Sequence, residues 1–216
     1  MSARLDISGL EALGSFVRTS ADPSEAPDGL RSAGLFDEGG LTNEASIWGS
    51  IIAAPDLDGE VLRLLPERVD RFRLWCGPSG YVMAGAGGAA GQVGSGPFGL
   101  LLTEIALIIS PVLQYGREDV GSASQLSIDL AQLMVDGPES RQFAQDPLLG
   151  LTAVRPMDRS GGIVLLSTSS GLRVGEPMSA GPTTLSPVTT LSAWGMITKV
   201  VTKMCQPGNS PGGFSR

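Results

Sequence analysis

The chain has 216 residues, a formal net charge of −7 and a hydrophobic fraction of 42%. That length suits one domain or two fused halves, and the apolar fraction is enough for a core. With no histidine in the sequence, imidazole bases and histidine metal ligands are excluded. The only lysines are Lys199 and Lys203, and no basic cluster occurs, which argues against binding to nucleic acid or to an anionic membrane surface.

Cysteine usage and the N-terminal residues indicate a cytoplasmic protein. Cys76 and Cys205 lie far apart with no CxxC motif, which is typical of buried or incidental thiols in a reducing compartment. A disulfide between them stays open. The first ten residues include Arg4 and Asp6 and lack the apolar run of a signal peptide.

The N-terminal third predicts two amphipathic helices. Residues 8–18 place apolar side chains on one helical face, with Ser8 as the expected cap. Residues 19–28 hold two prolines and three acids and predict a loop. After the turn at 37–40, Thr42 or Asn43 caps a second helix over 44–53.

A hairpin follows these helices. Residues 57–69 are compatible with a helical turn or a strand. Residues 71–75 alternate as a strand does, residues 77–80 (Gly-Pro-Ser-Gly) form a tight turn, and residues 81–84 return.

Residues 85–96 are rich in glycine, and we expect a flexible loop there. The run that begins at Gly85 formally fits the GxGxx[GA] pattern of dinucleotide sites. Such a site also needs a helix that opens directly after the glycines, and here a further glycine-rich stretch intervenes before Pro97. Nucleotide binding is therefore kept only as an alternative.

The remaining residues predict helices around a second set of strands. Residues 98–112 predict a buried helix, shorter than the ~20 residues that span a bilayer. Ser122 or Ser124 caps a helix over 125–135, with Leu126, Leu130, Leu133 and Met134 inward. Strands are expected at 148–154, 163–168, 172–178 and 183–188. Thr189 or Thr190 then caps a last helix whose apolar residues are Leu191, Trp194, Ile197, Val200, Val201 and Met204.

The order of these elements repeats. Residues 1–116 and 117–205 each predict helices, then strands, then an apolar helix, and residues 206–216 predict a disordered tail. We therefore expect an α+β fold, with a central, mainly antiparallel β-sheet flanked by helical bundles and two pseudo-symmetric halves.

No catalytic motif stands out. The serines in residues 77–80 and 94–96 lack the GxSxG form of a nucleophile elbow, and no acidic loop has the spacing of a calcium site. We predict a protein that is not an enzyme and has no cofactor and no metal.

Two segments resemble one family. Residues 34–42 (Gly-Leu-Phe-Asp-Glu-Gly-Gly-Leu-Thr), followed by a helix and the Pro55-Asp56 exit, look like the N-terminal half of the EspG family. These proteins are the specificity chaperones of mycobacterial and other actinobacterial type VII (ESX) secretion systems. Residues 163–178, then Thr-Leu-Ser-Pro at 184–187 and a closing helix, resemble that family's last meander.

The second segment departs from the family pattern at its turn. The family has a DTxxGR turn, whereas this chain has Ser-Thr-Ser-Ser-Gly-Leu-Arg at 167–173. Thr168 and Gly171 match, but the family's Asp and Arg are Ser167 and Leu172 here. The middle of the chain is also shorter than in the family.

The resemblance implies a cytoplasmic chaperone that binds a PE–PPE-type heterodimer and keeps it soluble for secretion. It implies partner-binding residues in the C-terminal meander, for which the candidates are Ser167, Ser169, Arg173 and Met178. We expect a monomer or weak homodimer without membrane insertion. Two alternatives remain, a small-molecule- or nucleotide-binding protein that uses residues 85–96 and a non-catalytic interaction subunit with another partner.

Overall fold

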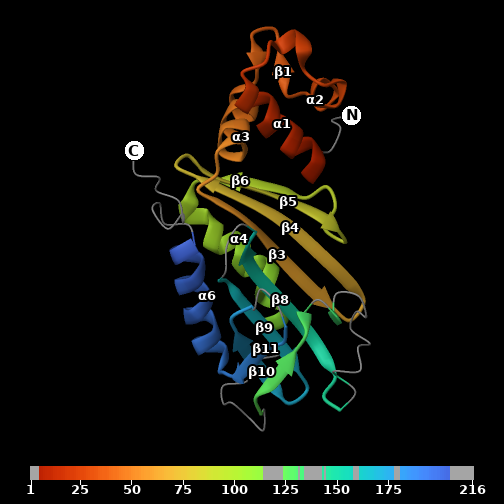
Figure 1. Ribbon diagram of the computed structural model, residues 1–216, viewed down its shortest axis with the longest axis vertical. Coiled ribbons are helices and arrows are strands. Elements are labelled where there is room, and N and C mark those ends of the chain that lie inside the picture. Colours follow the sequence, from red (N-terminus) through yellow and green to blue (C-terminus); the bar gives the residue numbers. More distant parts are fainter. Residues whose placement is uncertain are drawn as a thin grey trace.

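The computed structural model describes residues 5–113, 124–130, 132–133, 143, 145–157, 161–177 and 181–204. Figure 1 shows an elongated molecule, with a helical end built from the N-terminal residues and a long twisted sheet that runs through the rest.

Helices and short β-bridges make up the N-terminal end, and strands make up the centre. The helices are α1 (Ile7–Thr19), the 3₁₀ turn η1 (Pro23–Glu25), α2 (Asp28–Ser32), α3 (Asn43–Ala53), α4 (Phe98–Leu113) and α6 (Thr190–Met204). The strands are β1 (Phe36–Asp37), β2 (Gly40–Leu41), β3 (Leu57–Leu65), β4 (Arg68–Gly77), β5 (Gly80–Gly87), β6 (Val93–Gly96), β7 (Leu126–Ile128), β8 (Leu148–Pro156), β9 (Ile163–Thr168), β10 (Gly171–Gly175) and β11 (Thr183–Pro187).

Within the described residues, nine strands form one antiparallel sheet in the order β6-β5-β4-β3-β8-β9-β10-β11-β7. The two halves meet where β3 pairs with β8, with Val61 opposite Val154. Outward from β3, the strands β4, β5 and β6 follow in chain order and lead into α4. Outward from β8, the strands β9, β10 and β11 follow in chain order and lead into α6, and β7 pairs with the outer edge of β11. The predicted α+β fold with two pseudo-symmetric halves is confirmed. The boundary predicted at 116/117 and the tail at 206–216 lie outside the described residues.

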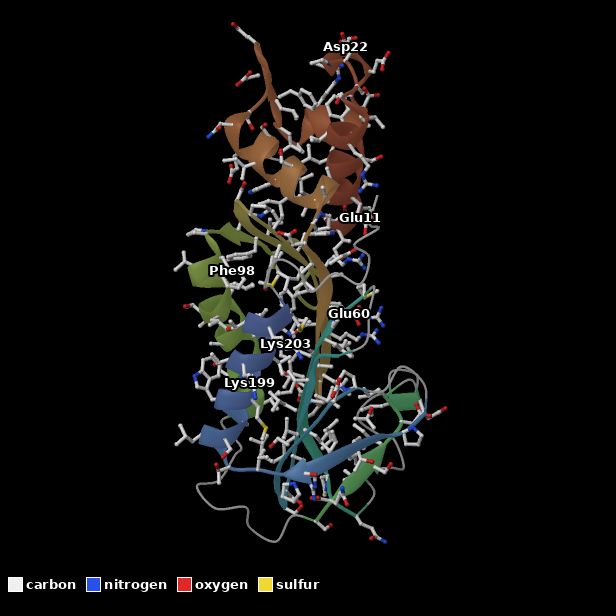
Figure 2. All side chains as sticks on the ribbon, turned by 60° about the vertical axis from the view of Figure 1, so that its left-hand side comes forward. Glu11, Asp22, Glu60, Phe98, Lys199 and Lys203 are labelled. Atoms are coloured by element: carbon white, nitrogen blue, oxygen red, sulfur yellow. The ribbon has the colours of Figure 1, made fainter. Side chains whose placement is uncertain are left out.

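Alternation along the strands gives the sheet two apolar faces. One face, which includes Val61 and Leu165, packs against both α4 and α6. On the opposite face, Trp75, Val82 and Ala84 pack under α1, α2 and α3. A third cluster covers the far end of that face and includes Leu166 and Leu185. In Figure 2, Glu60 lies on the side of β3 away from Lys199 and Lys203 of α6, as alternation with Val61 requires.

Side-chain caps set the starts of three helices. The Asp6 carboxylate accepts from the Gly9 N–H, so α1 begins at Ile7, and the predicted cap at Ser8 is wrong. Of the two candidates at the second helix, Thr42 is the cap and its hydroxyl accepts from the Ala45 N–H. At the last helix the cap is Thr189, which accepts from the Ser192 N–H.

Pairing within the sheet decides one segment that the sequence left open and overrides the local pattern at two others. Residues 57–65 form β3, which settles the segment left open between helix and strand. Residues 85–96 are not a loop but the end of β5, a short turn and β6. The helix predicted over 125–135 is wrong at its start, since Leu126–Ile128 form β7 against β11.

The last helix agrees with the prediction except at one residue. Ile197, Val201 and Met204 of α6 face the sheet, as expected from their spacing. Leu191 points outward instead and is 81% exposed. At 3.6 residues per turn, Leu191 lies about 120° around the helix from Ile197 and so points away from the sheet.

A buried charge pair joins the β3–β4 hairpin to α4. The Arg63 guanidinium donates from Nε at 2.8 Å and from Nη2 at 2.5 Å to Asp70, whose side chain is fully buried. Arg63 Nη1 donates to the Ile108 carbonyl at 2.9 Å, and Arg68 Nε donates to the same carboxylate. The pair therefore satisfies two buried charges and ties the helix to the sheet.

Removing one partner of this pair should destabilise the fold. We expect Asp70→Ala to lower the free energy of unfolding by about 3–5 kcal/mol, because Arg63 keeps a buried charge without its partner. Glu60→Gln is the control, since Glu60 pairs with the half-exposed Arg155 and should cost about 0–1 kcal/mol. Urea unfolding measures the free energy of unfolding of both variants. Equal losses would contradict the larger contribution expected of the buried pair.

Two glycines let α1 and α3 pack closely. A Cβ at Gly14 would lie 2.5 Å from Ile52 Cγ2, and a Cβ at Gly49 would collide with Val17. Gly195 of α6, in contrast, has open space around it.

Because their surroundings differ, the same change of glycine to alanine should stabilise the fold at Gly195 and destabilise it at Gly14. Gly195→Ala should stabilise by about 0.5–1 kcal/mol through helix propensity alone. Gly14→Ala has the same propensity gain but overpacks Ile52, so we expect a net loss of about 1–2 kcal/mol. Thermal unfolding of both variants tests this, and stabilisation by Gly14→Ala would mean that the two helices are not in close contact.

Candidate functional site

The predicted partner-binding residues separate in the structure. Ser167 lies in β9 and is fully buried, and its hydroxyl has no hydrogen-bond partner. Alternation with Leu165 directs it toward the face under α4 and α6. Arg173 of β10 pairs with Leu166 and lies on the opposite face, 3% exposed. Ser169, in the turn between these strands, is exposed, and Met178 lies outside the described residues.

The Arg173 side chain is held by polar groups from three segments. Its Nε donates to the Ser124 carbonyl at 2.7 Å, and Nη1 donates to Thr168 Oγ1 at 2.7 Å. Its Nη2 donates to Ser170 Oγ at 2.8 Å and to Asp146 Oδ2 at 3.1 Å. Arg173 is thus a buried structural cation in the chain as it stands, rather than a surface group.

Asp146 is the centre of this cluster. Its carboxylate accepts from the hydroxyls of Thr168 at 2.6 Å, Ser169 at 2.7 Å and Ser170 at 2.5 Å, and from the Ser170 N–H at 3.0 Å. The carboxylate holds the whole β9–β10 turn in one geometry. We call Asp146, Thr168, Ser169, Ser170 and Arg173 the turn cluster.

The environment of Asp146 favours its charged form. Burial acts to raise the pKa of this carboxyl, but the hydrogen bonds from Ser170, Thr168 and Ser169 outweigh it and hold the pKa well below the usual range. Sequence reasoning missed Asp146 because 22 residues separate it from Thr168. The adjacent hydroxyls at 168–170 were the only signal that an acceptor was needed.

The glycine-rich residues 85–96 do not have the geometry of a dinucleotide site. Gly85 and Gly87 belong to β5, and the Gly85 N–H donates to the Gln92 carbonyl at 2.8 Å. The next helix, α4, begins at Phe98 only after β6. The amides of these glycines therefore do not converge on a helix N-terminus.

Metal-binding clusters, membrane-spanning helices and cysteines are the other features that bear on function. Among the residues that the structure describes, no group of three or more acidic or cysteine side chains could hold a metal ion. In the same residues, no helix is long and apolar enough to cross a membrane. Cys76 is buried in β4, and Cys205 lies outside the described part of the chain.

Two exposed apolar side chains lie in the first turns of α6, near the turn cluster. The Val188 N–H donates to the Leu172 carbonyl at 3.0 Å, which places the start of α6 next to β10. Leu191 and Met196 are the exposed residues, and their spacing of five positions directs them to different sides of the helix. A turn held by polar groups and these apolar side chains can together contact a partner's surface.

The contribution of the Asp146 carboxylate to the free energy of unfolding should depend on pH. Since the folded pKa lies below the unfolded value of about 3.9, the carboxylate stabilises the fold above about pH 4, and this stabilisation is lost as the pH falls through the folded pKa. We expect Asp146→Asn to cost about 1–3 kcal/mol at neutral pH. Its difference from the unsubstituted chain should shrink at low pH.

Urea unfolding across the acidic range measures this difference. Ser169→Ala is the control, because it removes one exposed donor and should cost less than about 1 kcal/mol. A cost of Asp146→Asn that is the same at every pH would contradict the charged network.

Comparison with known proteins places the fold. No protein-family model matches the sequence, and no curated protein matches it. A solved structure does match: the Mycobacterium tuberculosis type VII secretion system chaperone EspG5 in complex with the PE25–PPE41 dimer. The likeness covers 91% of this chain and 94% of that chain, with a TM-score of 0.52 and 13% sequence identity. At that identity the likeness shows the fold alone, and the chain has an EspG-like fold.

Proposed function

We propose that this chain is a cytoplasmic chaperone that binds a PE–PPE-type helical heterodimer and keeps it soluble for type VII secretion. The observation that carries the proposal is the EspG-like fold, which extends over nearly the full length of both chains. The residue patterns at 34–42 and 163–187 support it independently of the coordinates. The protein that shares the fold is a chaperone bound to such a dimer.

The mechanism is the burial of apolar surface. A partner that exposes a large apolar patch is prone to aggregation, and covering that patch prevents it. A specific complex of this kind buries roughly 1,600 Å² in total. This function needs shape and a stable surface and no reactive side chain, and so it fits a chain that is not an enzyme.

The contact surface that we propose is the β9–β10 turn together with the first turns of α6. Ser169 is exposed at the turn, and Leu191 and Met196 supply apolar area close by. Ser167 and Arg173 are buried, so in this proposal they position the turn and do not touch the partner. Met178 stays a candidate contact.

A non-catalytic subunit with another partner is the competing function, and the same surface would serve it. Nucleotide binding has less support, because residues 85–96 form a hairpin. We expect no thermal shift on addition of a dinucleotide.

Co-purification tests the proposal. Each PE–PPE pair of the source organism is co-expressed with the tagged chain, and we expect at least one pair to be retained as a stoichiometric complex. Retention of none of them would overturn the proposal.

A paired substitution tests the surface. Leu191→Asp combined with Met196→Asp should weaken client binding at least about tenfold, which is 1.4 kcal/mol, because it puts charge on the apolar contact. Ile47→Asp is the matched control, since Ile47 is also an exposed apolar residue but lies on α3 at the other end of the molecule. Equal loss in both variants would place the contact elsewhere.

A further inference from the structure

Among the strands that the structure describes, β6 is the edge of the sheet on the N-terminal side and pairs only with β5. We propose that this edge binds an extended segment of a partner protein, which adds to the sheet as a further strand. The segment has apolar side chains on both of its faces, at odd and at even positions, and carries a basic residue. This site is separate from the proposed client surface, which lies in the other half of the sheet.

The hydrogen-bond pattern shows which groups are available. The Gly85 N–H donates to the Gln92 carbonyl, and the register then pairs Val93 with Ala84 and Ser95 with Val82. In an antiparallel ladder, bonded and non-bonded pairs alternate. The N–H and C=O groups of Val93 and Ser95 therefore point away from β5, toward the open edge.

Hollows flank β6 on both sides. One, of about 280 Å³, lies between β6 and α4 and is lined by Val93, Gly94 and Leu107 among others. The second, of about 400 Å³, lies between β6 and α3 and is lined by Ser95, Ile47 and Trp48 among others. An added strand directs successive side chains to opposite faces, so each hollow can receive alternate side chains.

Exposed apolar side chains gather around this edge. Ile47 of α3 is 43% exposed and Leu107 of α4 is 65% exposed, and each lines one of the hollows. Leu100 of α4, 52% exposed, lies beside Gly96. Native sheets usually protect an edge with charged residues, whereas β6 (Val-Gly-Ser-Gly) has none. An uncharged edge with an apolar border is suited to strand addition.

Charge favours a basic segment. Glu44 is exposed at the rim of the α3-side hollow, and Glu104 lines the α4-side hollow. Burial, followed by the nearby Glu104 carboxylate, raises the pKa of Tyr81 to about 12, so this carboxylate lies beside the phenol. Arg63 also lines the α4-side hollow, but its charge is paired with Asp70.

A second copy of this chain fits the edge less well. The β6 strand of that copy would present side chains from Val93 and Ser95 on one face only, because the alternate positions are Gly94 and Gly96. The hollow beside α4 would then stay unfilled. The occupant that fills both sides is a segment with side chains on both faces.

The test is selection from a phage-displayed library of random eight-residue peptides against the full chain. We expect enriched peptides to carry apolar residues at both odd and even positions, one set for each hollow, together with lysine or arginine. An enriched peptide is then synthesised, and its affinity is measured by fluorescence polarisation. No enrichment, or enrichment of peptides with apolar residues on one face only, would overturn the proposal.

Backbone variants test strand addition itself. Ser95→Pro removes an outward N–H while leaving the β5–β6 ladder intact, since edge strands tolerate proline there. It should weaken peptide binding at least about tenfold, because strand addition relies on main-chain hydrogen bonds. Ser95→Thr keeps the N–H and raises strand propensity, so it should bind as well as the unsubstituted chain or better. Equal binding by both variants would exclude strand addition.

A side-chain variant covers the case in which Ser95→Pro disturbs folding. Leu107→Lys places a cation on the α4-side hollow and should also weaken binding at least about tenfold, since it repels the basic segment. Leu191→Lys, on a comparably exposed residue of α6, should leave binding unchanged. If Leu107→Lys binds the peptide as well as Leu191→Lys does, the proposed site is overturned. A dimer in sedimentation that Ser95→Pro abolishes would assign the edge to a second copy and also overturn the proposal.

Discussion

The antiparallel pair of β3 and β8 is the contact on which the rest of the structure depends. These nine-residue strands come from the two halves of the chain, and their backbone hydrogen bonds join a four-strand unit and a five-strand unit into one sheet. Neither unit could bury both of its apolar faces alone. The pair therefore brings α4 and α6 onto a common face, where one core cluster contains side chains from both helices.

Two buried arginines stabilise the hairpins at which partners could act. Arg63 ties β3 and β4 to α4, and Arg173 ties the β9–β10 turn to Asp146 and Ser124. Each buried cation is matched by a carboxylate, and so each is costly to disturb. The surface beside each is different. Next to Arg173 there is an exposed polar turn, and the start of α6 is close by. Arg63 lines the α4-side hollow, which extends to β6 at the open edge of the sheet.

Sequence reasoning found the fold class and most strands, because alternation, turn glycines and helix spacing are local signals. The strand at 163–168 and the caps Thr42 and Thr189 are examples. It failed where sheet pairing decides the outcome, as at β6 and β7. It predicted Arg173 and Ser167 as contact residues but not that both are buried, and it missed Asp146. Which face a strand residue occupies depends on neighbours that are distant in sequence.

Hydrogen–deuterium exchange of the chain, with and without a purified PE–PPE-type dimer, tests the central claim most directly. The account predicts protection of the backbone amides at 169–172 and 190–197, where the turn cluster and the start of α6 lie, while β6 exchanges as before. No change anywhere, or protection confined to α1, α2 and α3, would contradict it.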